Sequence, residues 1–301
     1  MRTLVIGGTG LIGVHTCLEL AERGHRVVVA GRRRPDESSL VATLPFMPGD
    51  YANGDFDTAA LSGFEAIVFT AGSDVRHVRP EDEGTEYWAR HHSAGVPALA
   101  LAARDAGVQR FVQVGSCYHM VRPDLIDTDP YVRARRDADE GVRALADAGF
   151  AATTVNPPPI VGMIPGASAR RFARLVRWAR GEHDDRFPPL VAPPGGTNYL
   201  TVRSLAEAIA GALERGVPGT AYLVGDQNLS YAEYFQLLVD IAGGSGRVRV
   251  HDAEHSFLPD RMIVPGRGTL LRYEPPAEQT ALLGYRRDDV AAMLTEMVAA
   301  S

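Results

Sequence analysis

Three side chains in the middle of the sequence have types and spacing that suit proton transfer. Tyr131 follows Ser116 by fifteen residues, and Arg135 follows Tyr131 by four. Residues 131–148 have a helical pattern that ends before Gly149, so Tyr131 and Arg135 share one helix face. A cation beside a phenol favours the phenolate and lowers a phenol pKa of about 10 towards neutral pH. The spacing therefore places a cation beside the Tyr131 phenol, where it could tune the phenol pKa; an aromatic residue that covers a helix start is the other interpretation.

A glycine-rich turn near the N-terminus suits the phosphates of a dinucleotide. Residues 7–13, GGTGLIG, follow the apolar run 2–6 and lead into an amphipathic helical pattern. Gly7 permits a tight turn, Gly10 lets the backbone approach a pyrophosphate, and Gly13 lets helix and strand pack closely. Free N–H groups at the helix start face the anion. The residues expected to bind the cofactor here are Gly7, Thr9, Gly10, Leu11, Ile12 and Gly13.

The residues that follow the next apolar run, 26–30, indicate whether the site prefers NAD(H) or NADP(H). A site for NAD usually has an acidic residue there, which accepts a hydrogen bond from the ribose 2′-hydroxyl. Here three arginines, 32–34, follow the run, and Asp36 comes several residues too late. A guanidinium can pair with a 2′-phosphate. We therefore expect NADP(H), with NAD(H) as the alternative, bound by Arg32 first and Arg33 second; a solvated basic turn is the other interpretation.

Strand and helix patterns alternate over the first half of the chain. Strands are predicted at 2–6, 26–30, 44–47, 66–70, 109–115 and 151–156, and helices follow the first strand and span 84–106 and 131–148. The alternation predicts an α/β fold: a Rossmann-type, doubly wound parallel sheet with helices on both faces.

After Asn156 the composition changes, because prolines gather at 157–159 and again in 187–196. We therefore place a dinucleotide-binding domain at 1–165 and a smaller substrate-binding lobe at 166–301. Residues 199–225 return to a strand and helix pattern and are expected to rejoin the first domain. Another helix is predicted at 231–242, whereas 252–276 has no pattern that we can assign.

The glycine turn resembles that of the short-chain dehydrogenase/reductase superfamily, in its extended and atypical, epimerase/dehydratase-like branch. Its pattern is Gly-x-x-Gly-x-x-Gly, and the segments NYLTVRSLAEAIAGAL and AYLVGD follow in the order typical of that branch. The resemblance therefore spans almost the whole chain. It implies that Ser116 orients a substrate carbonyl, that Tyr131 is the acid/base, and that a cation at position 135 assists.

The sequence departs from the family at that position, where arginine replaces lysine. Arg135 can still hold the cofactor ribose and polarise Tyr131, but a guanidinium does not readily release a proton. Three hypotheses stay open. Arginine substitutes with altered efficiency, or Tyr118 or His119 is the acid, or the site binds cofactor without turnover.

The resemblance assigns further cofactor contacts. An aspartate after the third strand lies near the adenine, and small residues after the fourth strand let the backbone pass the cofactor. The segment 156–162 resembles Arg-Pro-x-x-Val-Tyr-Gly and forms a stiff wall beside the nicotinamide, although Val161 replaces the tyrosine. The residues so assigned are Asp50, Tyr51, Ala71, Gly72, Pro157 and Ile160.

Composition limits the partners. The net charge is −6, and all of the fixed cations are arginines. We therefore expect no nucleic acid or membrane partner, and no apolar run approaches the roughly eighteen residues of a membrane span.

Cys17 and Cys117 form no disulfide framework, which favours the cytoplasm. The pair 91–92 lacks further ligands at metal spacing, so we expect no metal, and a homodimer is expected by analogy only.

The function expected from these features is NADP(H)-dependent oxidation or reduction, by a ketoreductase or secondary alcohol dehydrogenase acting on a small organic ketone. One alternative is a sugar-nucleotide epimerase or dehydratase that keeps NAD tightly bound. Another is a non-catalytic protein that senses NADP(H). The lobe shows no evident basic pocket for a nucleotide diphosphate, which favours the ketone; the arginines of 170–180 are expected to form a solvated helix face.

Overall fold

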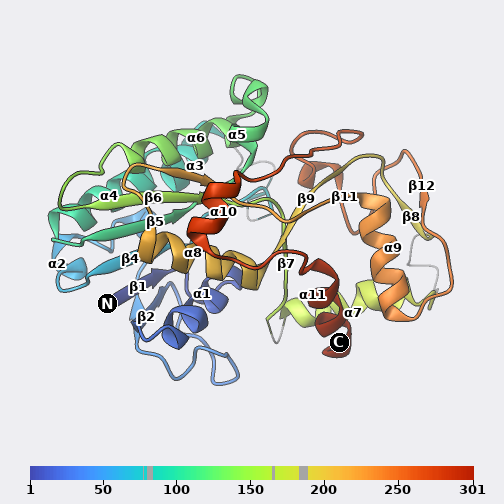
Figure 1. The fold of residues 1–301 in the computed structure, drawn as a ribbon, viewed down its shortest axis with the longest axis horizontal. Helices are drawn as coiled ribbons and strands as arrows, with labels where there is room; N and C mark the ends of the chain where they lie inside the picture. The colour runs from blue at the N-terminus through green and yellow to red at the C-terminus, as the bar shows by residue number, and fades with distance from the viewer. Residues whose placement is uncertain (77, 80–83, 165–166, 183–188) are drawn as a thin grey trace. The chain divides into compact units, whose positions relative to one another are not determined.

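The computed structural model describes residues 1–76, 78–79, 84–164, 167–182 and 189–301 (Figure 1). The chain forms two compact units. Unit 1 contains residues 1–157, 203–224 and 275–285, and unit 2 contains residues 158–202, 225–274 and 286–301. Among the described helices, none combines the length and the apolar character needed to cross a membrane.

Unit 1 is built on a parallel sheet of seven strands in the order β10-β6-β5-β4-β1-β2-β3. This confirms the predicted α/β fold. The strands are β1 Arg2–Ile6, β2 Arg26–Gly31, β3 Phe46–Pro48, β4 Ala66–Phe69, β5 Arg110–Val114, β6 Ala151–Asn156 and β10 Ala221–Leu223. Because the strands are parallel, their carboxyl ends meet at one edge, where ligands bind in folds of this type.

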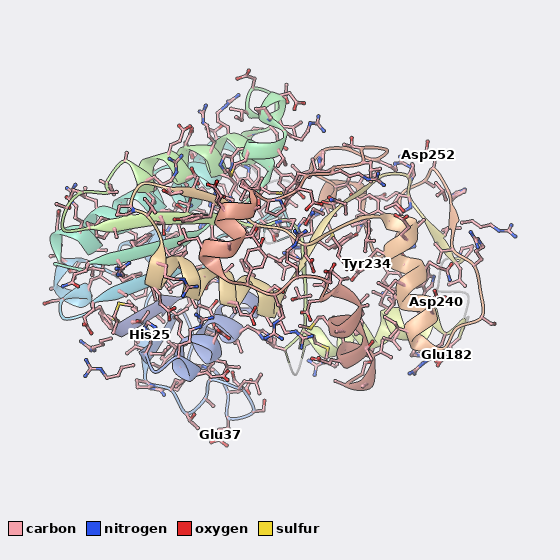
Figure 2. The ribbon with its side chains drawn as sticks, viewed as in Figure 1. His25, Glu37, Glu182, Tyr234, Asp240 and Asp252 are labelled. Carbon is pink, nitrogen blue, oxygen red and sulfur yellow. The ribbon has the colours of Figure 1, made fainter. Side chains whose placement is uncertain are left out.

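Helices cover both faces of this sheet, with α4 and α6 on one face and α1 and α8 on the other (Figure 1). The helices of unit 1 are α1 Leu11–Glu22, α2 Thr58–Leu61, α3 Thr85–Trp88, α4 Gly95–Asp105, α5 Tyr118–Val121, α6 Pro130–Arg143, α8 Val202–Arg215 and α10 Ala277–Leu283. Short 3₁₀ turns lie at η1 Tyr51–Asn53 and η3 Pro123–Ile126. His25, labelled in Figure 2, precedes β2 and lies 3.3 Å from Glu214 of α8.

Two predicted helices differ from the observed ones. The helix predicted at 84–106 is interrupted by the π-helical turn η2, Ala89–Ser93, a feature that is frequent at functional sites. Helix α6 ends at Arg143 rather than at 148, so that boundary was wrong. The reason is a local turn, in which the Asp147 carboxylate accepts from the main chain of Gly149 and Phe150.

The strand faces turned towards α4 and α6 are apolar in the middle and polar at the carboxyl end. Phe111 and Ala152 belong to the hydrophobic core on that face. Side chains alternate along a strand, so Gln113, Thr154 and Asn156 continue the same face, and all three are buried. A buried polar layer therefore lies where the sheet meets the start of α6.

In its described residues, unit 2 combines two small sheets with three α-helices. The strands are β7 Ile160–Val161, β8 Val191–Ala192, β9 Gly196–Thr201, β11 Gln227–Ser230 and β12 Arg249–Val250, and the helices are α7 Ala167–Ala179, α9 Tyr231–Ala242 and α11 Val290–Ala299. The sheets have the orders β11-β9-β7 and β12-β8. Helix α9 starts with a capping box between Ser230 and Glu233. Tyr234 of α9 (Figure 2) stacks on Tyr199 at 4.5 Å.

The segment without a sequence pattern, 252–276, contains the 3₁₀ turn η4, Asp260–Met262, and isolated β-bridges at His255–Leu258 and at Leu270, which pairs with Gly196. The chain then enters α10 and rejoins unit 1, an excursion that the sequence did not predict.

Candidate active site

The glycine turn between β1 and α1 has the geometry of a dinucleotide cradle. Gly7 has φ +86°, which L side chains rarely adopt, and a Cβ there would lie 2.6 Å from the nitrogen of Ala71. At Gly13 a Cβ would lie 2.1 Å from the Gly7 carbonyl oxygen. Both glycines are therefore required by the protein itself, as their predicted roles in turning and close packing demand.

Gly10 differs, because the protein does not require a glycine there. A Cβ on Gly10 would meet nothing closer than the Gly7 oxygen at 3.4 Å, an ordinary contact. No side chain among the described residues caps α1 at Gly10. The N–H groups of Leu11, Ile12 and Gly13 have no carbonyl partner within the helix. The absence of a packing reason for Gly10 and the uncapped helix start both fit a bound pyrophosphate.

The basic turn after β2 leaves two arginines available. Arg32 and Arg33 are exposed and form no ion pair with any residue that the structure describes. Arg34 instead places its guanidinium 5.3 Å from the ring centroid of Phe46. The carboxylate of Asp36 accepts from the main chain and the hydroxyl of Ser38, so it is engaged in its own loop.

Gly31, just before the arginines, adjoins the glycine turn. A Cβ on Gly31 would lie 3.3 Å from the hydroxyl oxygen of Thr9. Thr9 thus connects the turn to the end of β2, where a ribose would have to be recognised. The structure brings these two predicted parts of the cofactor site together.

The predicted adenine-side pair lies on η1. Asp50 caps this turn by accepting from the main chain of Ala52 at 3.0 Å. The hydroxyl of Tyr51 donates to the carbonyl of His91 at 3.0 Å, and its ring lies edge-on to Phe69. Tyr51 is therefore held by the protein at both its hydroxyl and its ring.

The predicted acid/base residues come together at the carboxyl end of β5. Ser116 follows this strand after Gly115, and its side chain lies close enough to Tyr131, at the start of α6, to act on the phenol. Asp129 caps α6 by accepting from Tyr131 and Val132, which fixes the tyrosine in the first turn. The Arg135 guanidinium carbon lies 5.9 Å from the Tyr131 ring centroid. All three predicted residues are buried.

The predicted lowering of the Tyr131 pKa was wrong in its net direction. Burial of Tyr131 raises its pKa, and this effect outweighs the opposing charges of Arg135 and Arg76 and the hydrogen bond from Ser116. The helix spacing places the cation beside the ring as expected, but removing the phenol from water disfavours the phenolate more strongly. Tyr131 is thus kept protonated at neutral pH.

Arg135 is held by a histidine that sequence analysis did not assign to the site. Arg135 donates from Nη2 to the carbonyl of Val114 at 3.2 Å and from Nη1 to Nδ1 of His92 at 3.4 Å. Nε2 of His92 lies 2.8 Å from the Ser73 carbonyl oxygen. A carbonyl only accepts, so Nε2 carries the proton and Nδ1 is the acceptor. Burial and then the Arg135 charge lower the pKa of His92, which keeps it neutral.

Gly72 has a role in placing Arg135 in addition to its expected place beside the cofactor. A Cβ on Gly72 would lie 2.7 Å from Nη1 of Arg135. Ala71, its neighbour, packs against Gly7. No sequence pattern links Gly72 or His92 to Arg135, because they lie 63 and 43 positions away along the chain.

The two alternative acids, Tyr118 and His119, are also buried near the strand end. Burial lowers the pKa of His119 and outweighs the carboxylate of Asp139, whose Oδ2 lies 3.9 Å from Nε2 of the histidine. His119 is therefore predominantly neutral at pH 7.

The predicted wall residues fall in separate units. Pro157 ends unit 1, where its carbonyl accepts from the main chain of Cys117 at 3.0 Å. This bond joins the loops after β5 and β6. Ile160 begins β7 in unit 2.

A family profile matches most of the chain. Residues 3–225 match the profile described as the NAD dependent epimerase/dehydratase family. The chain belongs to this family. The match confirms the predicted membership of the extended short-chain dehydrogenase/reductases, whose members are enzymes that use nicotinamide cofactors.

The proteins to which this chain is similar are named for different activities. The chain is 27% identical over 281 residues to "Sterol demethylase protein B" of Methylococcus capsulatus, covering 87% of this chain and 79% of that protein. It is 24% identical over 262 residues to a 4-hydroxy-2-methyl-3-oxo-4-farnesyl-3,4-dihydroquinoline-1-oxide ketoreductase of Stigmatella aurantiaca, covering 81% and 74%. A UDP-glucose-4-epimerase structure from Stenotrophomonas maltophila with bound NAD has a TM-score of 0.74, 20% identity and coverage of 100% and 98%.

Proposed function

We propose that this protein is an NADP(H)-dependent ketoreductase, or secondary alcohol dehydrogenase, that acts on a small organic ketone. The observation that carries the proposal is the buried Tyr131 phenol, which lies near the Ser116 hydroxyl and beside the Arg135 cation. The phenol carries its proton at neutral pH, so it can donate that proton to a ketone oxygen.

Each side chain has one role in this reaction. The bound cofactor supplies the hydride for the carbonyl carbon. The Ser116 hydroxyl donates a hydrogen bond to the ketone oxygen and holds it near Tyr131. Tyr131 donates its proton to that oxygen as negative charge develops there, and the guanidinium of Arg135 stabilises the remaining phenolate. Arg135 acts as a fixed charge, because a guanidinium retains its proton.

The cofactor preference rests on the turn after β2. Arg32 and Arg33 are exposed and without ion-pair partners among the described residues, and Asp36 is engaged with Ser38. A dianionic 2′-phosphate suits two available guanidinium groups, whereas a ribose 2′-hydroxyl lacks the acidic partner that it usually has.

A second function has its own support. The structure with TM-score 0.74 is a UDP-glucose-4-epimerase with bound NAD, so a sugar-nucleotide epimerase or dehydratase with NAD is the alternative. The similarity to a protein named as a ketoreductase over 81% of the chain supports the first function. The two differ in net consumption of NADPH, which only the reductase shows.

The first test is a titration of the purified protein with NADPH and with NADH, followed by nicotinamide fluorescence. We expect tighter binding of NADPH and at least a tenfold loss of this preference in Arg32→Ala, since a charge-assisted hydrogen bond contributes about 1.5–3 kcal/mol. The matched control is Arg34→Ala, because Arg34 packs on Phe46. Tighter binding of NADH would favour the epimerase.

The second test measures ketone-dependent NADPH oxidation by Tyr131→Phe. We expect turnover to fall at least tenfold, since a positioned acid contributes about 10²–10⁴-fold, with NADPH affinity retained. Undiminished turnover would remove Tyr131 from this role and favour Tyr118 or His119. Binding of NADPH without turnover of any ketone would instead indicate the sensing protein.

A further inference from the structure

We propose that Asp139 is a positioning residue for Ser116 and acts through Asn156. This inference rests on the proposed function, because it concerns the placement of the hydroxyl that orients the ketone. Asp139 lies on α6 and Asn156 at the end of β6. Neither contacts the glycine turn in the described hydrogen bonds, so their effect is on Ser116 rather than on cofactor binding.

A direct chain of hydrogen bonds links the three residues. The main-chain N–H of Ser116 donates to Oδ1 of Asn156 at 3.0 Å. The Asn156 amide then donates from Nδ2 to Oδ1 of Asp139 at 2.9 Å. The exposed fractions of Ser116, Asn156 and Asp139 are 6%, 0% and 1%, so water does not compete for these bonds.

The chemistry of each partner fixes the direction of this chain. A carboxylate only accepts, so the Asn156 NH₂ group must face Asp139, and its carbonyl oxygen must then face Ser116. An amide in place of Asp139 could either donate or accept, so it would not fix the orientation of Asn156 from that side. Asp139 thus selects the orientation of Asn156 that can accept from Ser116.

Asp139 itself is held on its remaining sides. Arg143 donates to Oδ2 from Nε at 2.7 Å and from Nη2 at 2.6 Å, and the Thr154 hydroxyl donates to Oδ1. Arg143 also reaches the Gly219 carbonyl at 3.3 Å. A buried carboxylate with these donors has one position and one orientation.

The helix spacing links this network to the proton donor. Tyr131, Arg135 and Asp139 follow one another at intervals of four on α6 and share one face. The face that carries the phenol therefore also carries the carboxylate that holds the loop of Ser116. Because misplacement of a reacting group by about 1 Å can cost about 10²-fold in rate, this link sets the distance between the two hydroxyl groups.

Gly115 provides an independent sign that Asn156 is built into the strand end. A Cβ on Gly115 would lie 1.8 Å from Oδ1 of Asn156. The Gly115 N–H also donates to the Val155 carbonyl at 2.7 Å. Only glycine at position 115 leaves room for the Asn156 amide beside the strand end.

The test uses Asp139→Asn, Asn156→Asp and the exchanged double variant in the full chain. In D139N the side chain at 139 keeps a single acceptor oxygen, and the donors of Arg143 and Asn156 compete for it. In N156D two carboxylates face each other. In the double variant, an amide at 139 again faces a carboxylate at 156, which can accept from Ser116. Asp137→Asn is the matched control, because the half-exposed Asp137 pairs with Arg136.

The first readout is amide hydrogen exchange of residues 114–118 in the cofactor-free protein, which does not depend on any reaction. We expect faster exchange in both single variants, protection regained in the double variant, and no change in D137N. Unchanged exchange in D139N and N156D would overturn the proposal. Because N156D can fail to fold, D139N and the double variant are sufficient for this comparison.

The second readout is ketone reduction with NADPH. We expect kcat to fall about tenfold or more in D139N, with the Kd of NADPH within about threefold of the original value and partial recovery of kcat in the double variant. If D139N lowers the free energy of unfolding but leaves kcat unchanged, the network is merely structural and the positioning role is overturned. If the unmodified protein reduces no ketone, the proposed function fails, while the exchange measurement still decides whether Asp139 holds Ser116.

Discussion

Two buried histidines, one in each unit, lie beside the two tryptophans of the chain and differ in their partners. His92 in unit 1 stacks on Trp88 at 5.7 Å, and both of its ring nitrogens have partners, the Ser73 carbonyl and Arg135. His255 in unit 2 lies 5.8 Å from Trp178. Its Nδ1 accepts from the main chain of Phe257, and its Nε2 has no hydrogen-bond partner among the described residues.

The difference shows how burial and function can be separated. Both side chains are almost fully buried, with 0% and 3% exposed, and burial lowers the pKa of both. Of the two, only His92 connects a buried cation, Arg135, to the main chain after β4, at Ser73. His255 is surrounded by the rings of Trp178, Phe235 and Phe257, so its contribution is to packing within unit 2.

The largest expected effect separates the two histidines by turnover. His92→Phe preserves an aromatic ring but removes the acceptor for Nη1 of Arg135. Losing a hydrogen bond to a charged group costs about 1.5–3 kcal/mol, so we expect kcat for ketone reduction to fall about 10–100-fold. His255→Phe is the matched control, with kcat expected to remain unchanged. Equal effects of both substitutions would show that His92 acts only through stability.

A smaller effect tests whether Gly72 serves Arg135. A Cβ in Gly72→Ala would lie 2.7 Å from Nη1 of Arg135, so we expect a displaced guanidinium and a kcat lowered about tenfold, since overpacking costs about 1–3 kcal/mol. In an Arg135→Lys background the guanidinium is absent, and the same substitution is expected to cost less. A kinetic double-mutant cycle measures this coupling; additive effects would assign Gly72 to the cofactor alone.

The smallest expected effect is on the free energy of unfolding of the two units at acidic pH. Both histidines have a lowered pKa in the folded protein, so below about pH 6.5 the unfolded chain binds protons that the folded chain does not. The free energy of unfolding is therefore expected to be greatest above pH 6.5 and to fall by up to about 1.4 kcal/mol per pH unit for each histidine as the pH decreases.

Urea unfolding between pH 5 and pH 8 measures this dependence. Trp88→Phe leaves Trp178 as the fluorescent reporter of unit 2, and Trp178→Phe leaves Trp88 as the reporter of unit 1. His255→Phe should reduce the pH dependence reported by Trp178 and leave that reported by Trp88. A pH dependence of Trp178 that survives this substitution would assign the effect to other groups.

Local patterns predicted much of the fold and part of the site. The run 2–6 and the glycines of 7–13 predicted β1, the turn and α1, because strand alternation, helix periodicity and positive φ depend on neighbouring residues. The four-residue interval between Tyr131 and Arg135 likewise predicted their shared helix face. The end of α6 was missed, because the Asp147 turn that follows it competes with a sequence of good helix formers.

The remaining parts of the site could not be found in this way. The contacts of Arg135 with His92 and of Asn156 with Asp139 join residues on different elements, and no periodicity relates such positions. The direction of the Tyr131 pKa also depended on burial, which a neighbouring cation in the sequence does not reveal.

The sequence by itself determined the dinucleotide-binding turn, the alternating sheet and the order of Ser116, Tyr131 and Arg135, because each follows from interactions within a few residues or within one element. The tertiary structure alone decided that Tyr131 stays protonated, that His92 and Gly72 place Arg135, and that Asp139 and Asn156 hold Ser116. These features arise from desolvation and from hydrogen bonds between distant segments, which exist only once the sheet and α6 have packed together.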